Sequence, residues 1–213
     1  EEEDIMERLE RAFENCEKLQ RHMHFLLNKG GLYKVYNGNL LYHGCVPLKE
    51  DGNLKSVRIF GRVYKGKGLY EVLESYVRKG FYAMDPKEKE RGKDIIWYIW
   101  LSENSPLFGK DKMATFERYF LAEKETHKEK KNPYYLLLED EKVVGKILKE
   151  FGLENEDAHI INGHVPVKCK DGENPVKCGG KVLVIDGGFS KAYQKETGIA
   201  GYTLIYNSYG LIL

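Results

Sequence analysis

The sequence predicts an α/β fold. Four segments repeat apolar residues every three or four positions, which is the period of an amphipathic helix. Shorter runs rich in valine, isoleucine, leucine and tyrosine lie between turns that contain glycine, as strands do. Because the expected strands lie between and after the expected helices, the chain should form a mixed arrangement of the two.

The first helix is expected over residues 3–28, where Ile5, Leu9 and Phe13 begin the apolar repeat and Gly30-Gly31 ends it. A hairpin should follow, because Asn37-Gly38 is the dipeptide most typical of a two-residue turn. Its strands are expected at residues 32–36 and 40–42. Two further short strands flank Gly61, at residues 57–60 and 62–64.

The later elements follow from the same patterns. A helix is expected over residues 68–79, closed by Gly80, and another over residues 140–151, stopped by Gly152. The segment 87–100 becomes strongly apolar in its second half, which should therefore be buried. The remaining expectations are a short helix within residues 110–120, a solvated, highly charged connector at 123–131, and strands at 159–162, 182–185 and 202–206.

Composition restricts the classes of function. The chain has 213 residues, 42% of them hydrophobic, and a formal net charge of +1, so no general attraction to nucleic acid or to an anionic membrane is expected. Its four cysteines form no Cys-x-x-Cys pair, which favours a reducing, cytoplasmic compartment. No apolar run approaches the ~20 residues that span a bilayer. The first residue is Glu1, without an initiator methionine, and the chain resembles a segment of something longer.

Two histidines stand in matching contexts. His43 and His164 each follow an apolar, strand-like run, lie beside a glycine and precede a proline. Neutral imidazole is a favoured ligand of first-row divalent metals, and strand ends in α/β sheets are where ligands collect. A histidine at a strand end is more often hydrogen-bonded to backbone than coordinated to a metal. Two histidines alone also do not complete a dinuclear site, which needs bridging carboxylates.

A second cluster of interest is the loop at residues 102–112 and the short helix after it. Lys110 and Lys112 in the loop and Arg118 in the helix suit a phosphate, since arginine can bind two oxygens at once. The alternative is a solvated loop of mixed charge. Glu103 and Asp111 would weaken the positive potential there.

A third cluster follows the strand expected at 182–185. Asp186 opens an Asp-Gly-Gly turn and could orient a histidine ligand from behind, Lys191 could meet a phosphate, and Tyr193 could donate to sugar oxygens. The alternative is that Asp-Gly-Gly is simply a good turn.

Taken together, these segments closely resemble class III fructose-1,6-bisphosphatases, the Firmicutes-type bacterial enzymes of the calcineurin-like metallophosphoesterase superfamily. The resemblance covers essentially the whole chain. It rests on four stretches, the last of which is highly specific: residues 37–48, 104–120, 160–168 and 184–209.

The resemblance implies a four-layer α/β/β/α sandwich of mixed sheets, with a two-metal Mn²⁺ centre at strand ends. His43 and Gly163-His164 align with the superfamily's His-Gly and Gly-His metal-binding segments, and Arg118 and Lys110 would neutralise phosphate charge during catalysis. Lys112, Lys191 and Tyr193 would contact the substrate. The implied reaction is hydrolysis of the 1-phosphate of fructose 1,6-bisphosphate to fructose 6-phosphate and phosphate, a step of gluconeogenesis.

Three motifs of the superfamily are absent from this sequence: Gly-Asp-x-His, Gly-Asp-x-x-Asp-Arg and Gly-Asn-His/Asp. The resemblance implies that residues 1–213 are a single partial domain, the carboxy-terminal part of a catalytic domain, with residues 1–30 as its leading amphipathic helix. Its partner would be the missing amino-terminal part of the same domain. Alone, the chain is expected neither to hold two metals tightly nor to turn over substrate, and its homo-oligomeric state is left open.

Two other readings compete. The His-Gly and Gly-His segments occur across the superfamily, so the intact protein could be a metallophosphatase of phosphoproteins or dinucleotides. The chain could also be a scaffold without catalytic activity that retains half a site.

Overall fold

The computed structural model describes residues 1–213, except for the side chains of residues 192 and 193. The chain divides into two compact units, residues 1–31 and 32–213. The first unit contains helices α1 (Glu2–Glu14) and α2 (Glu17–Lys29). The prediction of one continuous helix over residues 3–28 is wrong, because two helices form there and the break lies at residues 15–16. The Asn15 side chain donates to the Arg11 carbonyl oxygen (2.7 Å), and Cys16 takes an extended conformation before α2 begins.

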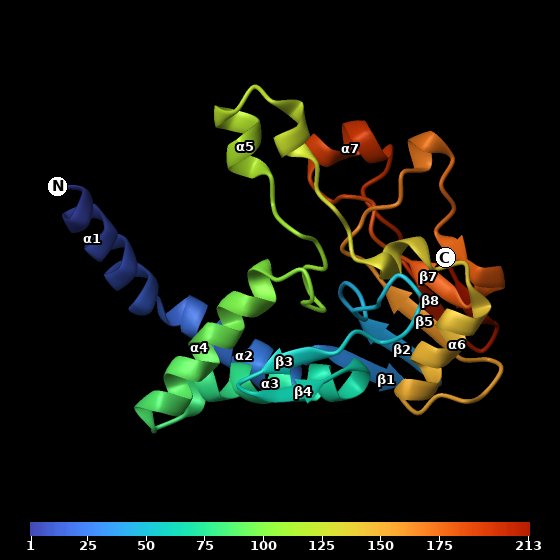
Figure 1. The fold of residues 1–213 in the computed structure, drawn as a ribbon, viewed down its shortest axis with the longest axis horizontal. Coiled ribbons are helices and arrows are strands. Elements are labelled where there is room, and N and C mark those ends of the chain that lie inside the picture. The colour runs from blue at the N-terminus through green and yellow to red at the C-terminus, as the bar shows by residue number, and fades with distance from the viewer. The chain divides into compact units, whose positions relative to one another are not determined.

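A five-stranded mixed sheet forms the centre of the second unit (Figure 1). Its order is β1-β2-β5-β7-β6, and β2, β5 and β7 run parallel while both outer strands are antiparallel. The predicted hairpin is confirmed, because β1 and β2 meet at Asn37-Gly38 and both turn residues have positive φ (48° and 74°). The strands are β1 (Tyr33–Tyr36), β2 (Asn39–Tyr42), β5 (His159–Asn162), β6 (Val176–Lys177) and β7 (Val182–Val184).

One face of the sheet is covered by α6 (Glu141–Glu150). Leu40, Ile160 and Val182, one from each parallel strand, are fully buried in the same core cluster as Val144 and Ile147 of this helix. The predicted ends of α6 are confirmed: the Asp140 carboxylate accepts from two backbone N–H groups of the first turn, and Gly152 follows the helix with a φ of 84°.

Helices α3 (Gly66–Tyr82) and α4 (Pro86–Leu101) form an antiparallel pair. The sequence indicated that Gly80 ends the helix expected over residues 68–79, but α3 continues through Gly80 to Tyr82. Gly80 lies inside α3 against Gly92 of α4, where a Cβ on either glycine would collide with the backbone of the other helix. The predicted burial of the second half of α4 holds for one face only, since Ile95 and Ile99 are buried whereas Trp97 and Trp100 are 68% and 67% exposed.

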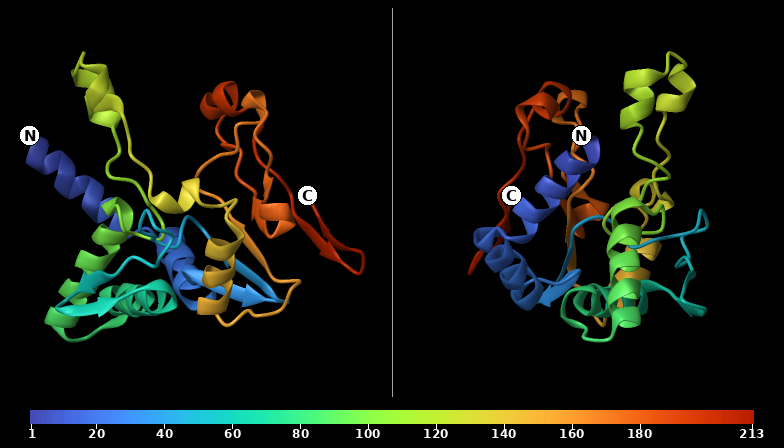
Figure 2. Two further views of the ribbon diagram at one scale, coloured as in Figure 1. Left: turned by 45° about the vertical axis from the view of Figure 1, so that its right-hand side comes forward. Right: turned by 90° about the vertical axis from the view of Figure 1, so that its left-hand side faces the viewer.

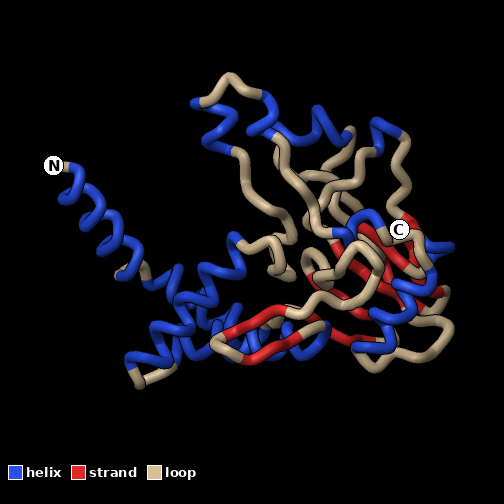
Figure 3. Tube along the Cα trace, viewed as in Figure 1, coloured by secondary structure: helices blue, strands red, loops and turns tan.

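Two hairpins lie outside the sheet: β3 (Val57–Ile59) with β4 (Arg62–Tyr64), as predicted, and β8 (Ile205–Asn207) with β9 (Gly210–Ile212). The strand expected at 202–206 therefore begins later than predicted. Figure 3 distinguishes these strands from the helices and from the long connections between them. No helix in the described part of the chain is long and apolar enough to cross a membrane.

Residues 110–131 leave the body of the second unit as an arm (Figure 2). The arm carries the predicted short helix, α5 (Thr115–Phe120), and the 3₁₀ turn η1 (Lys124–His127). Its two ends are joined by an isolated antiparallel β-bridge between the backbones of Lys110 and Lys131. The other short elements are the 3₁₀ turns η2 (Pro133–Leu136), η3 (Cys169–Asp171) and η4 (Cys178–Gly180), and helix α7 (Lys191–Thr197).

Candidate metal and phosphate site

The two histidines singled out by the sequence meet at one edge of the sheet. His43 directly follows β2 and His164 follows β5 by one glycine, and these strands are parallel neighbours. The carboxyl ends of parallel neighbours lie at a common edge, which brings the two side chains together. His43 Nε2 and His164 Nδ1 are 3.0 Å apart, and the ring centroids are 4.9 Å apart.

The backbone around the pair is tied by two further hydrogen bonds. The Gly163 N–H donates to the His43 carbonyl oxygen (2.9 Å), and the Asn162 side-chain Nδ2 donates to the Gly44 carbonyl oxygen (3.0 Å). Asn162 was not recognised from the sequence. An asparagine at the last position of a predicted strand was the available signal, but its partner could not be named before the pairing of β2 with β5 was known.

His164 lies at the centre of a γ-turn with a left-handed φ of 65°, closed by a bond from the Val165 N–H to the Gly163 carbonyl oxygen (2.8 Å). This turn is rare and strained for a residue with a Cβ, at a cost on the order of 1–3 kcal/mol. The strained backbone therefore coincides with the side chain expected to do chemistry.

Both imidazoles are held neutral near pH 7. Burial, together with the neighbouring His43 and Lys110, lowers the pKa of His164 to about 4, against opposing interactions with the Phe108 backbone and Asp186. Burial also lowers the pKa of His43, with Asp186 opposing. A neutral ring is the form that binds a metal.

The pair fits one side of a metal centre. The facing ring nitrogens are 3.0 Å apart, within hydrogen-bond distance, and two nitrogens that bind one ion at right angles, each about 2.1 Å from it, would have a similar separation. His164 Nε2 is buried without a hydrogen-bond partner. Among the described side chains, however, no group of three or more His, Cys, Asp or Glu is placed to hold a metal. The residues present therefore supply part of a ligand set.

Asp186 reaches the same edge from the third parallel strand, because it lies two residues beyond the end of β7. Its Oδ1 accepts from the Gly188 N–H (2.9 Å), as expected for the predicted turn. A Cβ built on Gly163 would lie 3.3 Å from the Asp186 Cβ, so glycine leaves room for this side chain. Asp186 is thus close enough to influence both histidines electrostatically.

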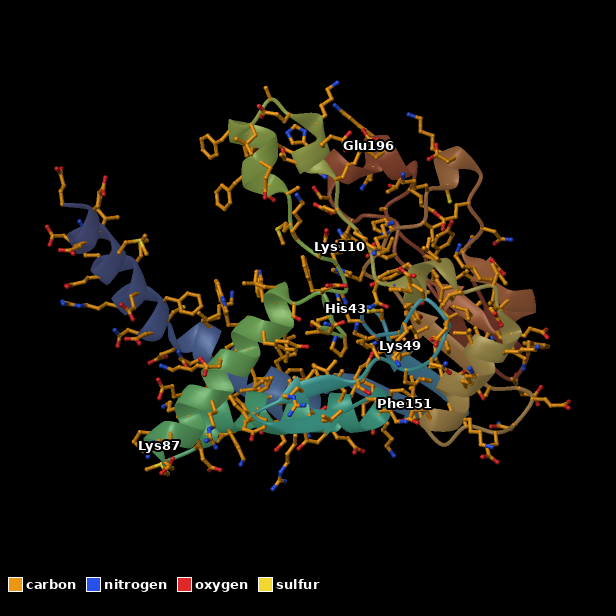
Figure 4. All side chains as sticks on the ribbon, in the orientation of Figure 1. His43, Lys49, Lys87, Lys110, Phe151 and Glu196 are labelled. Atoms are coloured by element: carbon orange, nitrogen blue, oxygen red, sulfur yellow. The ribbon has the colours of Figure 1, made fainter. Side chains whose placement is uncertain are left out.

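Lys110 and Arg118, two of the cationic residues predicted to bind phosphate, both contact the Glu129 carboxylate, which the sequence interpretation missed. Lys110 Nζ lies 3.1 Å from Glu129 Oε2 and an Arg118 guanidinium nitrogen lies 3.5 Å from Glu129 Oε1. Figure 4 labels Lys110 and His43, and the charge of Lys110 lies close enough to lower the pKa of His164. The Ala114 N–H also donates to Glu129 (3.1 Å). Glu129 lies in the charge run predicted to be a solvated connector, and spacing alone did not show that the arm folds back on itself.

The other predicted substrate-binding residues lie elsewhere in the unit. Lys112 Nζ donates to the Thr126 carbonyl oxygen within the arm (2.6 Å). Lys191 is exposed at the start of α7. The side chain of Tyr193 lies outside the described residues.

Comparison with known proteins supports one family. A family model described as Firmicute fructose-1,6-bisphosphatase matches residues 1–213. The chain is 59% identical over 213 residues to a fructose-1,6-bisphosphatase class 3 of Clostridium botulinum strain Hall, and 58% identical over 214 residues to that of Clostridium acetobutylicum. Both alignments include 100% of this chain and 32% of the relative, so the chain spans about a third of the length of these curated proteins. No solved structure matches.

Proposed function

Because the chain belongs to the Firmicute fructose-1,6-bisphosphatase family, we propose that it forms part of the site at which the intact enzyme removes the 1-phosphate of fructose 1,6-bisphosphate. The products would be fructose 6-phosphate and phosphate, a step of gluconeogenesis. The observation that carries the proposal is the meeting of His43 and His164 at the carboxyl ends of two parallel strands. All four cysteines are free, in keeping with action in a reducing cytoplasm.

In this proposal, His43 and His164 hold a divalent metal of the Mn²⁺ type. When bound, such a metal would act as a Lewis acid and would lower the pKa of a water molecule bound to it. The chain's own contribution is to favour the neutral form of both rings through partial desolvation and to fix their direction through the backbone bonds at Gly44 and His43. Asp186 lies near the pair, and its charge opposes the lowering of both histidine pKa values.

Lys110 and Arg118 are proposed to receive the phosphate group. Both now contact the Glu129 carboxylate, which occupies the kind of position that a phosphate oxygen would take between a lysine and an arginine. Binding of substrate would therefore exchange one anion for another. The Glu129 carboxylate keeps the two cations together in the meantime.

The remaining metal ligands are proposed to come from the rest of a longer polypeptide. The relatives are about three times as long as this chain, and the described residues contain only a partial ligand set. A partial set binds metal weakly, because affinity depends on ligand number and geometry. The chain alone should accordingly hydrolyse no fructose 1,6-bisphosphate.

The test is Mn²⁺-dependent phosphate release from fructose 1,6-bisphosphate by the full-length enzyme. His43→Gln and His164→Gln should each reduce kcat/KM by at least about 100-fold, while His159→Gln, at the opposite end of β5, should retain it. Equal activity in all three variants would contradict the proposed site. Turnover of a phosphoprotein or a dinucleotide in place of the sugar bisphosphate would contradict the proposed substrate.

A further inference from the structure

We propose that Asn162 is a positioning residue that fixes the spacing and orientation of the His43–His164 pair. The geometric claim is independent of the proposed function, and only the naming of the pair as metal ligands rests on it. Among the described residues, the Asn162 side chain forms no hydrogen bond to either ring. It would act through the backbone on which the two rings are mounted.

The parallel ladder stops just before the site. Its last pair between β2 and β5 is Leu41 with Ile161. Beyond that point two bonds continue the connection: the Asn162 side chain to the Gly44 carbonyl oxygen, and the Gly163 N–H to the His43 carbonyl oxygen. Together they fix the two peptide groups that follow His43, one on each side of Gly44, relative to the Asn162 side chain and the Asn162–Gly163 peptide. A side chain thus replaces a ladder bond where the strands have ended.

The site needs this restraint because its backbone is strained. His164 has a φ of 65° in a γ-turn, a conformation that a residue with a Cβ leaves readily unless its neighbours hold it. The bond from Asn162 lies two residues before this position. Without it, the bond from the Gly163 N–H to the His43 carbonyl oxygen is the backbone bond left beyond the end of the ladder to join the described residues around His164 to those around His43.

The chemistry of the asparagine side chain suits the role. Asn162 is 2% exposed, and its amide can donate across the gap to a carbonyl oxygen while remaining uncharged. Aspartate of the same shape could only accept when ionised and would repel the Gly44 carbonyl oxygen. Asn162 Oδ1 is buried without a partner, so this side chain pays a desolvation cost for one bond.

Asn39 provides a matched comparison within the same sheet. It begins β2, is 6% exposed, donates through Nδ2 to the Asn37 carbonyl oxygen (3.1 Å) and also buries an Oδ1 without a partner. It therefore resembles Asn162 in burial and in bonding, but lies at the end of the sheet away from the histidines. Asn39→Ala therefore reports the effect of losing a buried asparagine in general, and Asn162→Ala reports in addition the effect of losing the bond to Gly44.

The experiment uses the 213-residue chain, labelled with ¹⁵N at histidine, without metal. The readout is the through-hydrogen-bond ¹⁵N–¹⁵N coupling between His43 Nε2 and His164 Nδ1, which reports their contact directly. The coupling should be present in the parent chain and in Asn39→Ala, and lost in Asn162→Ala. If Asn162→Ala does not fold, Asn162→Ser, whose hydroxyl is too short to reach Gly44, should give the same loss in a folded chain.

A coupling that persists in the Asn162 variant, or that is lost equally in Asn39→Ala, would overturn the proposal. A second readout is Mn²⁺ affinity of the full-length enzyme by electron paramagnetic resonance. Asn162→Ala should weaken it by about 10–100-fold, and Asn39→Ala by less than about twofold. If the parent enzyme binds no Mn²⁺ while the coupling behaves as expected, the proposed function fails and the positioning role of Asn162 stands.

Discussion

Replacing His164 by glycine and by alanine should reveal the strain in its backbone. At ordinary dihedral angles, glycine is less stable than alanine by about 0.5–1 kcal/mol because it loses more backbone entropy on folding. At the φ of 65° found here, alanine carries a steric cost of about 1–2 kcal/mol that glycine avoids. The order should therefore invert, with His164→Gly more stable than His164→Ala by about 0.5–1 kcal/mol.

His159 supplies the control on the same strand. It begins β5 and has no left-handed φ, so His159→Gly should be less stable than His159→Ala by about 0.5–1 kcal/mol. Both variants at each position remove the same imidazole, and the comparison thus cancels the loss of ring contacts. Urea unfolding followed by circular dichroism gives the four free energies. The same order at both positions would show that His164 is not held in the strained conformation, and the reasoning about its restraint would fail.

Three other expectations follow from the structure. Gly92→Ala should destabilise the chain by about 1–3 kcal/mol, because its Cβ would collide with the backbone of α3. Gly145→Ala in α6 should instead stabilise the chain by about 0.5–1 kcal/mol, because a Cβ there meets nothing within 4 Å. Urea unfolding measures both differences. Burial raises the pKa of Glu129, but the Ala114 backbone and the nearby lysine and arginine lower it overall. Glu129→Gln should therefore reduce stability near pH 7, and the difference from the parent should vanish as the pH falls through the lowered pKa. Urea unfolding between about pH 7 and pH 3 would measure this difference. Burial raises the pKa of Cys45 to about 12, so iodoacetamide at about pH 8 should leave Cys45 unmodified in the folded chain, and peptide mass spectrometry should find the label on exposed Cys16.

The features that local sequence determines were predicted correctly. Asn37-Gly38 gave the hairpin because its backbone preference is a property of the two residues themselves. The start and end of α6 followed for the same reason from Asp140 and Gly152. The convergence of His43 and His164 was also anticipated, since strand ends and their flanking glycines are visible in the sequence.

The errors arose where the deciding partner is distant in the chain. Gly80 was read as a helix end, but its role is to let Gly92 approach, and the sequence does not show which helices cross. Glu129 was assigned to solvent because Lys110 is 19 residues away and reaches it only after the arm has folded. Asn162 was overlooked because its partner, Gly44, becomes a neighbour only through the parallel pairing of β2 with β5.

That parallel pairing also determines when the site can exist during folding. Leu41 lies beside Ile161 in the sheet, so closing this pair requires the intervening residues to form a very long loop. The β1–β2 hairpin closes locally, and during synthesis it is complete long before β5 has been made. Until then, β2 presents an unpaired edge that includes the apolar Leu40 and Leu41. The edge that carries the two histidines is therefore a late product of folding, and the nascent chain is most prone to aggregation while β2 awaits its partner.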